Sequence, residues 1–297
     1  MSHLFFSDAG KRIIDQKRMP QMLASGYFFT EGPVWSRREG RLYFTNFADN
    51  TIYSLTPGEQ PRLFRANSGR AVGLSLRKDH VLVGAETATH AVTLVYSDHS
   101  EIIANQYEGS MLNSPNDVIV STSGDIYFTD PYSVAMKGPR ELDFNGFYRV
   151  PYSHGKHGET KLLGIMERPN GLALSPDESI LYVNDTNHNH ILAYALQCDG
   201  TASLIGIFAR LDPQYGPGVA DGMKVDQEGN VYVTGPGGIW VFSSAGDRLA
   251  LIAFPQEVGN FCFGGSDGCT LFATATTSVY SMQTEIPGIM PQLLGKE

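Results

Sequence analysis

The chain has little positive charge: its 22 lysines and arginines are outnumbered by 31 aspartates and glutamates, which leaves a formal net charge of −9. Nucleic-acid binding depends on basic surfaces that neutralise phosphates, so this balance argues against a nucleic-acid partner. No block rich in lysine and arginine indicates contact with a membrane surface. No stretch approaches the roughly 18–20 apolar residues of a membrane-spanning helix. We therefore expect neither nucleic acid nor membrane as a partner, and the sequence leaves the oligomeric state open.

Cysteine is also scarce. Three cysteines, Cys198, Cys262 and Cys269, are too few to form a disulfide framework in a chain of 297 residues. Cys262 and Cys269 could pair across a hairpin, but we expect buried free thiols. The first residues have a short apolar step followed by charges, which does not fit a signal peptide. A cytoplasmic, reducing location is the expectation.

Sustained helical periodicity is absent apart from a weak candidate near the N-terminus. Instead, a short apolar strand begins six times just after the same kind of position, and consecutive positions lie 39 to 54 residues apart. Five of the six positions carry a side-chain oxygen, and Val72 is the exception. The five are Glu31, Asn116, Asn170, Asp221 and Asn260. A repeat of about 40–50 residues is the size of a propeller blade.

Each repeat has an inner strand, a turn rich in glycine and acidic residues, and further strands that alternate apolar with polar residues. The sequence therefore predicts an all-β fold, a six-bladed β-propeller. The segment QMLASGYFF before Glu31 would add an N-terminal strand to the last blade and close the ring. We expect an extension at 1–20, the propeller at 21–285 and a tail at 286–297. A β-sandwich or a pair of smaller β domains is the alternative.

Repeat-equivalent positions on the inner strands would converge on one channel. Glu31, Asn170 and Asp221 would then offer three oxygen ligands without a thiolate or an imidazole. Such a set favours Ca²⁺, with Mg²⁺, Mn²⁺ or Zn²⁺ as alternatives. Asn and Asp residues also cap turns, so each of them alone could be structural. Glu31 argues against that reading because glutamate is a poor turn capper.

The motifs EGPVW, SPNDV, PNGLALSPD, VNDT and DGMKVDQEGNVYVTGPGGIWVF resemble the SMP-30/gluconolactonase family, also called regucalcin-like, and within it the bacterial sugar-lactonase branch. The resemblance runs in order through all six blades. It implies a six-bladed propeller with one divalent metal ion, in which Glu31, Asn170 and Asp221 match the metal ligands. It also implies that Asn116 contacts the substrate or a metal-bound water, and that Asp185 lies near the metal. Asn260, repeat-equivalent to the ligands, would support them from behind.

The activity expected from this resemblance is hydrolysis of a lactone, a cyclic ester. The metal ion would act as a Lewis acid, and Asp221 would be the general base that takes a proton from the attacking water. Two alternatives remain open: another metal-assisted reaction on the same fold, such as a cyclisation or isomerisation, and a metal-stabilised binding protein without turnover. The partner would be a small-molecule lactone.

Two segments depart from the family pattern. Met111, Leu112 and Ser114 stand where relatives commonly carry arginine or other polar groups, which favours a lactone with few hydroxyl groups. The candidate walls of the substrate pocket are Met111, Tyr132, Met136 and Phe144. The long connection from Ser133 to Gly146 is a candidate lid. Glu86 and Asp130, at the ends of second strands, are expected to be solvated or to cap turns.

Overall fold

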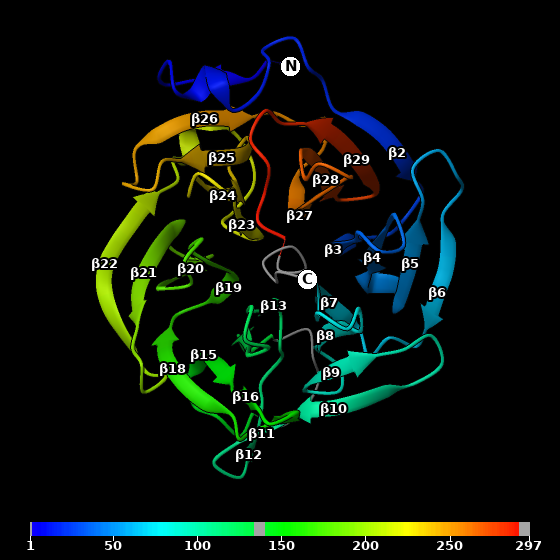
Figure 1. Cartoon of the computed structure of the whole chain (residues 1–297), viewed down its shortest axis with the longest axis vertical. Coiled ribbons are helices and arrows are strands. Elements are labelled where there is room, and N and C mark those ends of the chain that lie inside the picture. Colours follow the sequence, from blue (N-terminus) through cyan, green and yellow to red (C-terminus); the bar gives the residue numbers. More distant parts are fainter. Residues whose placement is uncertain (1, 134–139, 291–297) are drawn as a thin grey trace.

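The computed structural model describes residues 2–133 and 140–290 and contains six sheets arranged in a ring, as Figure 1 shows. Four blades have four strands of their own in chain order. Blade one has β3 (Thr30–Ser36), β4 (Arg41–Asn46), β5 (Thr51–Leu55) and β6 (Arg62–Ala66), and blade two has β7 (Ala71–Leu76), β8 (Leu82–Glu86), β9 (Ala91–Val95) and β10 (Ser100–Ala104). Blade three has β13 (Val118–Val120), β14 (Ile126–Asp130), β15 (Asn145–Val150) and β18 (Lys161–Met166), and blade four has β19 (Pro169–Leu174), β20 (Ile180–Asp185), β21 (His190–Leu196) and β22 (Ala202–Arg210).

The last two blades include strands from the start of the chain. Blade five has β23 (Met223–Val225), β24 (Val231–Gly235), β25 (Gly238–Phe242) and β26 (Arg248–Ile252), with β1 (Leu4–Phe5) added at its outer edge. Blade six has β27 (Val258–Gly264), β28 (Thr270–Ala275) and β29 (Ser278–Gln283), and β2 (Gln21–Ser25) is its fourth strand. The six-bladed propeller closed by an N-terminal strand is therefore confirmed.

Both ends of the described chain pack against the ring. Residues 10–12 form the 3-10 turn η1 (Gly10–Arg12), and Ile13 and Ile14 after it are buried against blades five and six. At the other end, the backbone N–H of Ile289 donates a 2.9 Å hydrogen bond to the carbonyl of Val225. Met290 is buried beside Trp35 and Phe272. In Figure 1 this red segment runs inward from β29 toward the centre of the ring.

The hydrophobic core lies between neighbouring blades. Tyr43 and Ile52 of blade one pack with Leu74 and Leu82 of blade two, and similar clusters join the other blades. Each fully buried aliphatic or aromatic side chain contributes about 1.5–3 kcal/mol to stability relative to the exposed state. Cys262 is buried and Cys269 is partly buried, and neither forms a disulfide, so the expected free thiols are confirmed. The helical elements within the described ranges are short 3-10 turns, including η2 (Phe47–Asp49) and η3 (Pro213–Tyr215), and no helix there could span a membrane.

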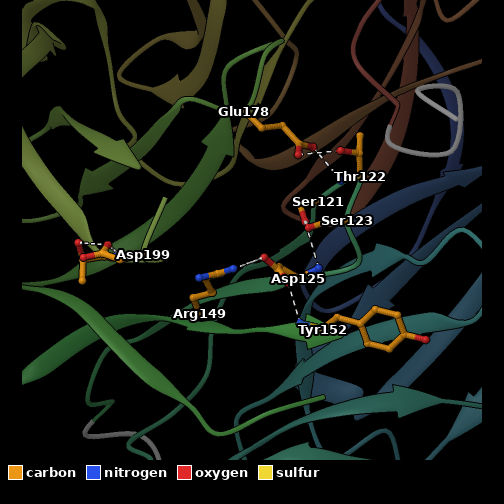
Figure 2. Close-up of polar contacts among 9 residues, drawn as sticks. Ser121, Thr122, Ser123, Asp125, Arg149, Tyr152, Glu178 and Asp199 are labelled. Carbon is orange, nitrogen blue, oxygen red and sulfur yellow. Dashed lines mark hydrogen bonds and ion pairs between the residues drawn. The ribbon is translucent and has the colours of Figure 1, made fainter. Parts of the chain in front are cut away.

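Polar contacts join the turns of blades three and four, as Figure 2 shows. Asp125 accepts hydrogen bonds of 2.9 and 2.6 Å from the guanidinium of Arg149 and a further one from the backbone N–H of Tyr152. Glu178 of blade four accepts two 2.8 Å bonds from the N–H and the hydroxyl of Thr122 in blade three. Two small hairpins complete the strands, β11 (Gln106–Tyr107) with β12 (Ser110–Met111) and β16 (Tyr152–Ser153) with β17 (Lys156–His157).

Candidate metal and substrate site

The inner strands share an irregularity at one end of the channel. The pairing register shifts in four of the six blades just where the repeat-equivalent residues lie. These shifts fall between Glu31 and Val34, Ala71 and Leu74, Pro169 and Leu172, and Val258 and Asn260. A bulge bends a strand and turns a side chain away from the regular alternation. In these four blades the bulge therefore interrupts the regular pairing at this end of the inner strand.

A glycine follows the ligand position because the next blade approaches closely there. A Cβ atom on Gly32 would lie 2.0 Å from the carbonyl oxygen of Val72, and one on Gly171 would lie 2.0 Å from that of Asp221. Both separations are far below van der Waals contact, so a side chain at either position would push two blades apart. The EGP and PNG motifs thus place repeat-equivalent positions of adjacent blades side by side, Glu31 next to Val72 and Asn170 next to Asp221.

A cavity of about 200 Å³ opens at this end of the channel. Four of the residues proposed from sequence line it together: Glu31, Asn116, Asn170 and Asp221. Glu31 is 2% exposed, whereas Asn116, Asn170 and Asp221 are partly exposed to the cavity. Aromatic and small polar side chains form most of the remaining wall, which comprises Phe29, Phe47, Val72, Thr87, Ser114, Pro131, Tyr132, Ser133 and Arg168.

The acidic groups of this site destabilise one another's charged forms. Burial raises the pKa of Asp221 well above its usual value, and the nearby charges of Glu31 and Asp117 raise it further. Burial likewise raises the pKa of Glu31, with a smaller contribution from Asp117. Several carboxylates in one low-dielectric channel repel each other unless a proton or a cation offsets their charge.

The oxygen atoms present fit a hard divalent cation. Asn170 donates from its Nδ2 to the hydroxyl of Thr186 at 3.1 Å, while its buried Oδ1 has no hydrogen-bond partner among the described residues. The Oε2 atom of Glu31 accepts a 3.0 Å bond from the backbone N–H of Gly32. No group of three or more His, Cys, Asp or Glu side chains within the described ranges could hold a metal. An amide oxygen would thus have to complete the donor set of Glu31 and Asp221.

Sequence reasoning placed Asn260 behind the ligands but missed Asp117 and Lys224, which form a second polar layer with it. Asp117 is 3% exposed, its Oδ1 accepts from the N–H of Val118 at 2.9 Å, and its Oδ2 has no partner among the described residues. Lys224 extends into the same layer, where its Nζ lies 3.3 Å from the Oδ1 of Asn260. The amide of Asn260 is close enough to Glu31 to lower the pKa of that carboxyl. Burial raises the pKa of Asp117, and the charge of Lys224 opposes that rise.

Two carboxylates, each at the end of a second strand, fix the backbone just before a residue of the site. Asp185 accepts hydrogen bonds from the backbone N–H groups of Glu167 and Arg168 at 3.1 and 3.2 Å, just before Asn170. Asp130 accepts from the N–H groups of Asn113 and Ser114 at 2.8 and 2.7 Å, just before Asn116.

Asp185 does not line the cavity wall given above, so its observed contacts are those of a structural support. Asp130 and Glu86 are both buried, so the expectation that they are solvated is wrong. The alternative expectation, that they cap turns, fits the two bonds that Asp130 accepts from backbone N–H groups. Burial raises the pKa of Asp130 to about 7, although its two backbone bonds act against the rise.

The candidate pocket walls separate into three groups. Tyr132 lines the cavity. Met111 and Phe144 are not among its described lining residues: the N–H of Met111 donates to Glu141, and Phe144 packs against Tyr107 in the core. Met136 lies outside the described residues, as do residues 134–139 of the candidate lid, Ser133 to Gly146. Arg168, which sequence reasoning passed over, is part of the wall.

Comparisons with known proteins agree with this architecture. The family model for the SMP-30/Gluconolactonase/LRE-like region matches residues 29–277. A gluconolactonase of Zymomonas mobilis is 30% identical over 311 residues, covering 95% of this chain and 86% of the relative. A pentonolactonase of Haloferax volcanii is 26% identical, covering 82% of this chain and 80% of the relative.

The fold matches a solved structure closely. A gluconolactonase of Xanthomonas campestris superposes with a TM-score of 0.87 at 25% identity, covering 96% of this chain and 95% of that one. The family match spans every blade, including the four positions that line the cavity. The chain therefore belongs to the SMP-30/Gluconolactonase/LRE-like region family.

Proposed function

We propose that this protein is a divalent-metal-dependent lactonase. The observation that carries the proposal is the meeting of Glu31, Asn116, Asn170 and Asp221, from four different blades, in one cavity of about 200 Å³. Relatives named gluconolactonase and pentonolactonase support hydrolysis of a cyclic ester as the reaction. The three free cysteines are compatible with the cytoplasm, which remains our expected compartment.

Glu31, Asn170 and Asp221 would hold one divalent ion, with Ca²⁺ the best match to an all-oxygen donor set. When bound, the ion supplies a Lewis acid for the lactone carbonyl. The two carboxylates neutralise a dication, which explains why the channel holds acidic groups whose pKa values burial raises. Asn260 and Lys224 lie behind the ligands and contact each other, and both lower the pKa of Glu31.

Asp221 would act as the general base. It takes the proton of the attacking water as the water oxygen bonds to the lactone carbonyl carbon. The ring C–O bond then breaks, and its oxygen leaves as a hydroxyl group after gaining a proton, so that one lactone and one water give one hydroxy acid. Asn116, partly exposed in the cavity wall, would position the substrate or the water.

The substrate is expected to carry few hydroxyl groups. Five of the thirteen wall residues form its apolar part: Phe29, Phe47, Val72, Pro131 and Tyr132. Each hydroxyl left unpaired on entering such a pocket costs about 1–3 kcal/mol. A simple aliphatic or aromatic lactone should therefore have a higher kcat/KM than glucono-1,5-lactone.

The test is a pH-drop assay with aliphatic, aromatic and sugar lactones, with Ca²⁺, Mg²⁺, Mn²⁺ and Zn²⁺ added in turn to protein freed of metal. We expect metal-dependent hydrolysis of at least one lactone and its loss in Asp221→Asn. If no lactone is opened with any of the four ions, the proposal fails and a non-hydrolytic reaction or a binding function takes its place.

A further inference from the structure

One cationic side chain in the cavity wall has no role in the reaction proposed above. Arg168 lines the cavity beside Asn170 and Asp221. Its backbone is fixed on both sides, because its N–H donates to Asp185 and its carbonyl accepts a 3.0 Å bond from the N–H of Thr186. The backbone of Arg168 therefore has a fixed position, directly before the inner strand of blade four.

The guanidinium of Arg168 has no hydrogen bond or ion pair with any side chain in the part of the chain that the structure describes. The adjacent carboxylate, Glu167, is engaged elsewhere: it accepts 2.7 Å bonds from the Nδ2 of Asn187 and pairs with His188. The carboxylates that share the cavity, Glu31 and Asp221, are the proposed metal ligands. Once they hold a dication, the charge of Arg168 remains without a counter-charge.

The rest of the cavity border adds positive charge. The guanidinium of Arg70 lies 6.0 Å from the ring centre of Phe47, and that of Arg140 lies 5.0 Å from the ring centre of Tyr132. Both rings line the cavity. The chain as a whole has a net charge of −9, so this local gathering of arginines runs against the overall balance. With a dication offsetting Glu31 and Asp221, these arginines would leave the cavity mouth positively charged, which attracts ligands of the opposite sign.

We propose that Arg168 binds a carboxylate substituent of the substrate, so that this site prefers lactones bearing a carboxylate over neutral lactones of the same shape. The planar guanidinium matches a carboxylate through two parallel hydrogen bonds, which gives geometric specificity as well as attraction. This inference rests on the proposed lactonase function and names the substrate class. It also agrees with the apolar part of the wall, because a carboxylate at one end of the substrate requires one charged partner, and the rest of the substrate can lie against the apolar side chains.

A matched substrate pair tests the inference directly. The lactone 5-oxotetrahydrofuran-2-carboxylate and its carboxamide differ by one charge and little in shape. For the wild-type protein we expect kcat/KM to be about 10- to 100-fold higher for the carboxylate, the range of a charge-assisted hydrogen-bonded pair. Arg168→Gln should remove this preference through KM for the carboxylate, with the carboxamide rate within about twofold of wild type. Arg168→Lys should restore part of the preference for the carboxylate, since lysine keeps the positive charge but lacks the paired N–H donors of the guanidinium.

Arg62→Gln is the control, because Arg62 is an exposed residue of β6 that pairs with Glu59 outside the cavity. It should leave the preference unchanged. Equal kcat/KM for the two lactones in the wild type would overturn the inference while leaving the lactonase proposal intact. So would an equal loss on both lactones in Arg168→Gln, since Arg168 would then serve the reaction or the fold rather than charge recognition.

Calorimetric titration with 2-hydroxyglutarate, the ring-opened product of the carboxylate lactone, gives a readout that does not need turnover. We expect binding to weaken about 10-fold or more in Arg168→Gln and to be unchanged in Arg62→Gln. If neither lactone is hydrolysed, the lactonase proposal loses support, and this titration alone decides whether the cavity recognises a carboxylate. Equal binding by wild type and Arg168→Gln, or none by either, would refute the role of Arg168.

Discussion

The hydroxyl of Thr129, on the second strand of blade three, donates a 2.7 Å hydrogen bond to the backbone carbonyl of Asn170 in blade four. The same contact recurs around the ring. Thr45 of blade one donates to the carbonyl of Val72 at 3.1 Å, and Thr234 of blade five donates to that of Gly259 at 3.1 Å. Each of these blades therefore sets the position of the next inner strand. The positions of the inner strands at the site therefore depend on threonines that do not line the cavity.

Thr129→Val should weaken metal binding, although Thr129 is not one of the proposed ligands. It removes the bond that holds the Asn170 backbone and the acceptor for the N–H of Asp117, so we expect about 10-fold weaker Ca²⁺ binding by calorimetry and about 1–3 kcal/mol lower stability. Thr45→Val is the matched control, because both threonines are fully buried but Val72 carries no ligand oxygen. Equal effects of the two substitutions on Ca²⁺ affinity would show that the contact supports stability alone.

Glu31→Gln should lose much of the Ca²⁺ affinity, since it removes one of two charges while keeping the shape of the side chain. Asn116→Ala should retain most of the affinity and instead lower turnover, because the proposed role of Asn116 is to position the substrate or the water. Calorimetry and steady-state kinetics on both variants separate these roles. A comparable loss of metal from Asn116→Ala would place that residue among the ligands.

Asp221→Asn should lower kcat by about 10²-fold or more if Asp221 is the general base. Asp221 also serves as a proposed ligand, so the assay must be run at Ca²⁺ concentrations that saturate the variant. KM should change far less than kcat under those conditions. If saturating Ca²⁺ restores most of kcat, the base lies elsewhere.

As pH rises, the stability of the metal-free protein should fall, whereas the affinity for Ca²⁺ should increase. Burial raises the pKa values of Glu31 and Asp221, so the folded metal-free protein binds more protons than the unfolded chain and should lose stability as pH rises through the raised pKa range. Ca²⁺ competes with those protons, so Ca²⁺ affinity should increase from pH 5.5 to 8, by up to about tenfold per pH unit for each proton released. Melting temperatures and calorimetry across this range test both signs. A pH-independent affinity would mean that the ligands are already ionised without the metal.

Lys224→Met should strengthen Ca²⁺ binding and weaken the metal-free fold. The ammonium group offsets the charges of Asp117 and Glu31, but it also repels a dication bound by Glu31. We expect a gain in Ca²⁺ affinity of about 3- to 10-fold together with a lower melting temperature without metal. Lys161→Met, at an exposed position of β18, is the control. Weaker Ca²⁺ binding in Lys224→Met would show that Lys224 orders the site rather than opposing the ion.

The repeat made the fold predictable, since each blade carries the same strand and turn signals. It also identified Glu31, Asn116, Asn170 and Asp221 as partners, because equivalent positions on inner strands face one channel. The same reasoning passed over Asp117 and Arg168, which flank those positions by one or two residues. Asp117 has no counterpart in the other repeats, and Arg168 has one only in Arg70, two residues before Val72. Their placement depends on the bulges and on the contacts of Asp130 and Asp185, which are tertiary.

The substrate wall was harder to predict for a similar reason. Met111 and Phe144 were candidates because their neighbourhood departs from the family pattern, yet Met111 lies in a small hairpin and Phe144 packs in the core. An apolar residue near a site in sequence can face the core as readily as the cavity. Only Tyr132 among the described candidates reaches the cavity, where it follows the second strand of blade three.

The most direct test of the central claim is the lactonase activity of protein stripped of metal by a chelator, measured as Ca²⁺ is returned, with the carboxylate-bearing lactone as substrate. We predict that activity disappears on stripping and returns in proportion to Ca²⁺ until one ion is bound per chain, and that Glu31→Gln requires much more Ca²⁺ to reach the same rate. Full activity in the stripped protein, or an identical Ca²⁺ dependence in Glu31→Gln, would contradict a catalytic metal held at Glu31, Asn170 and Asp221.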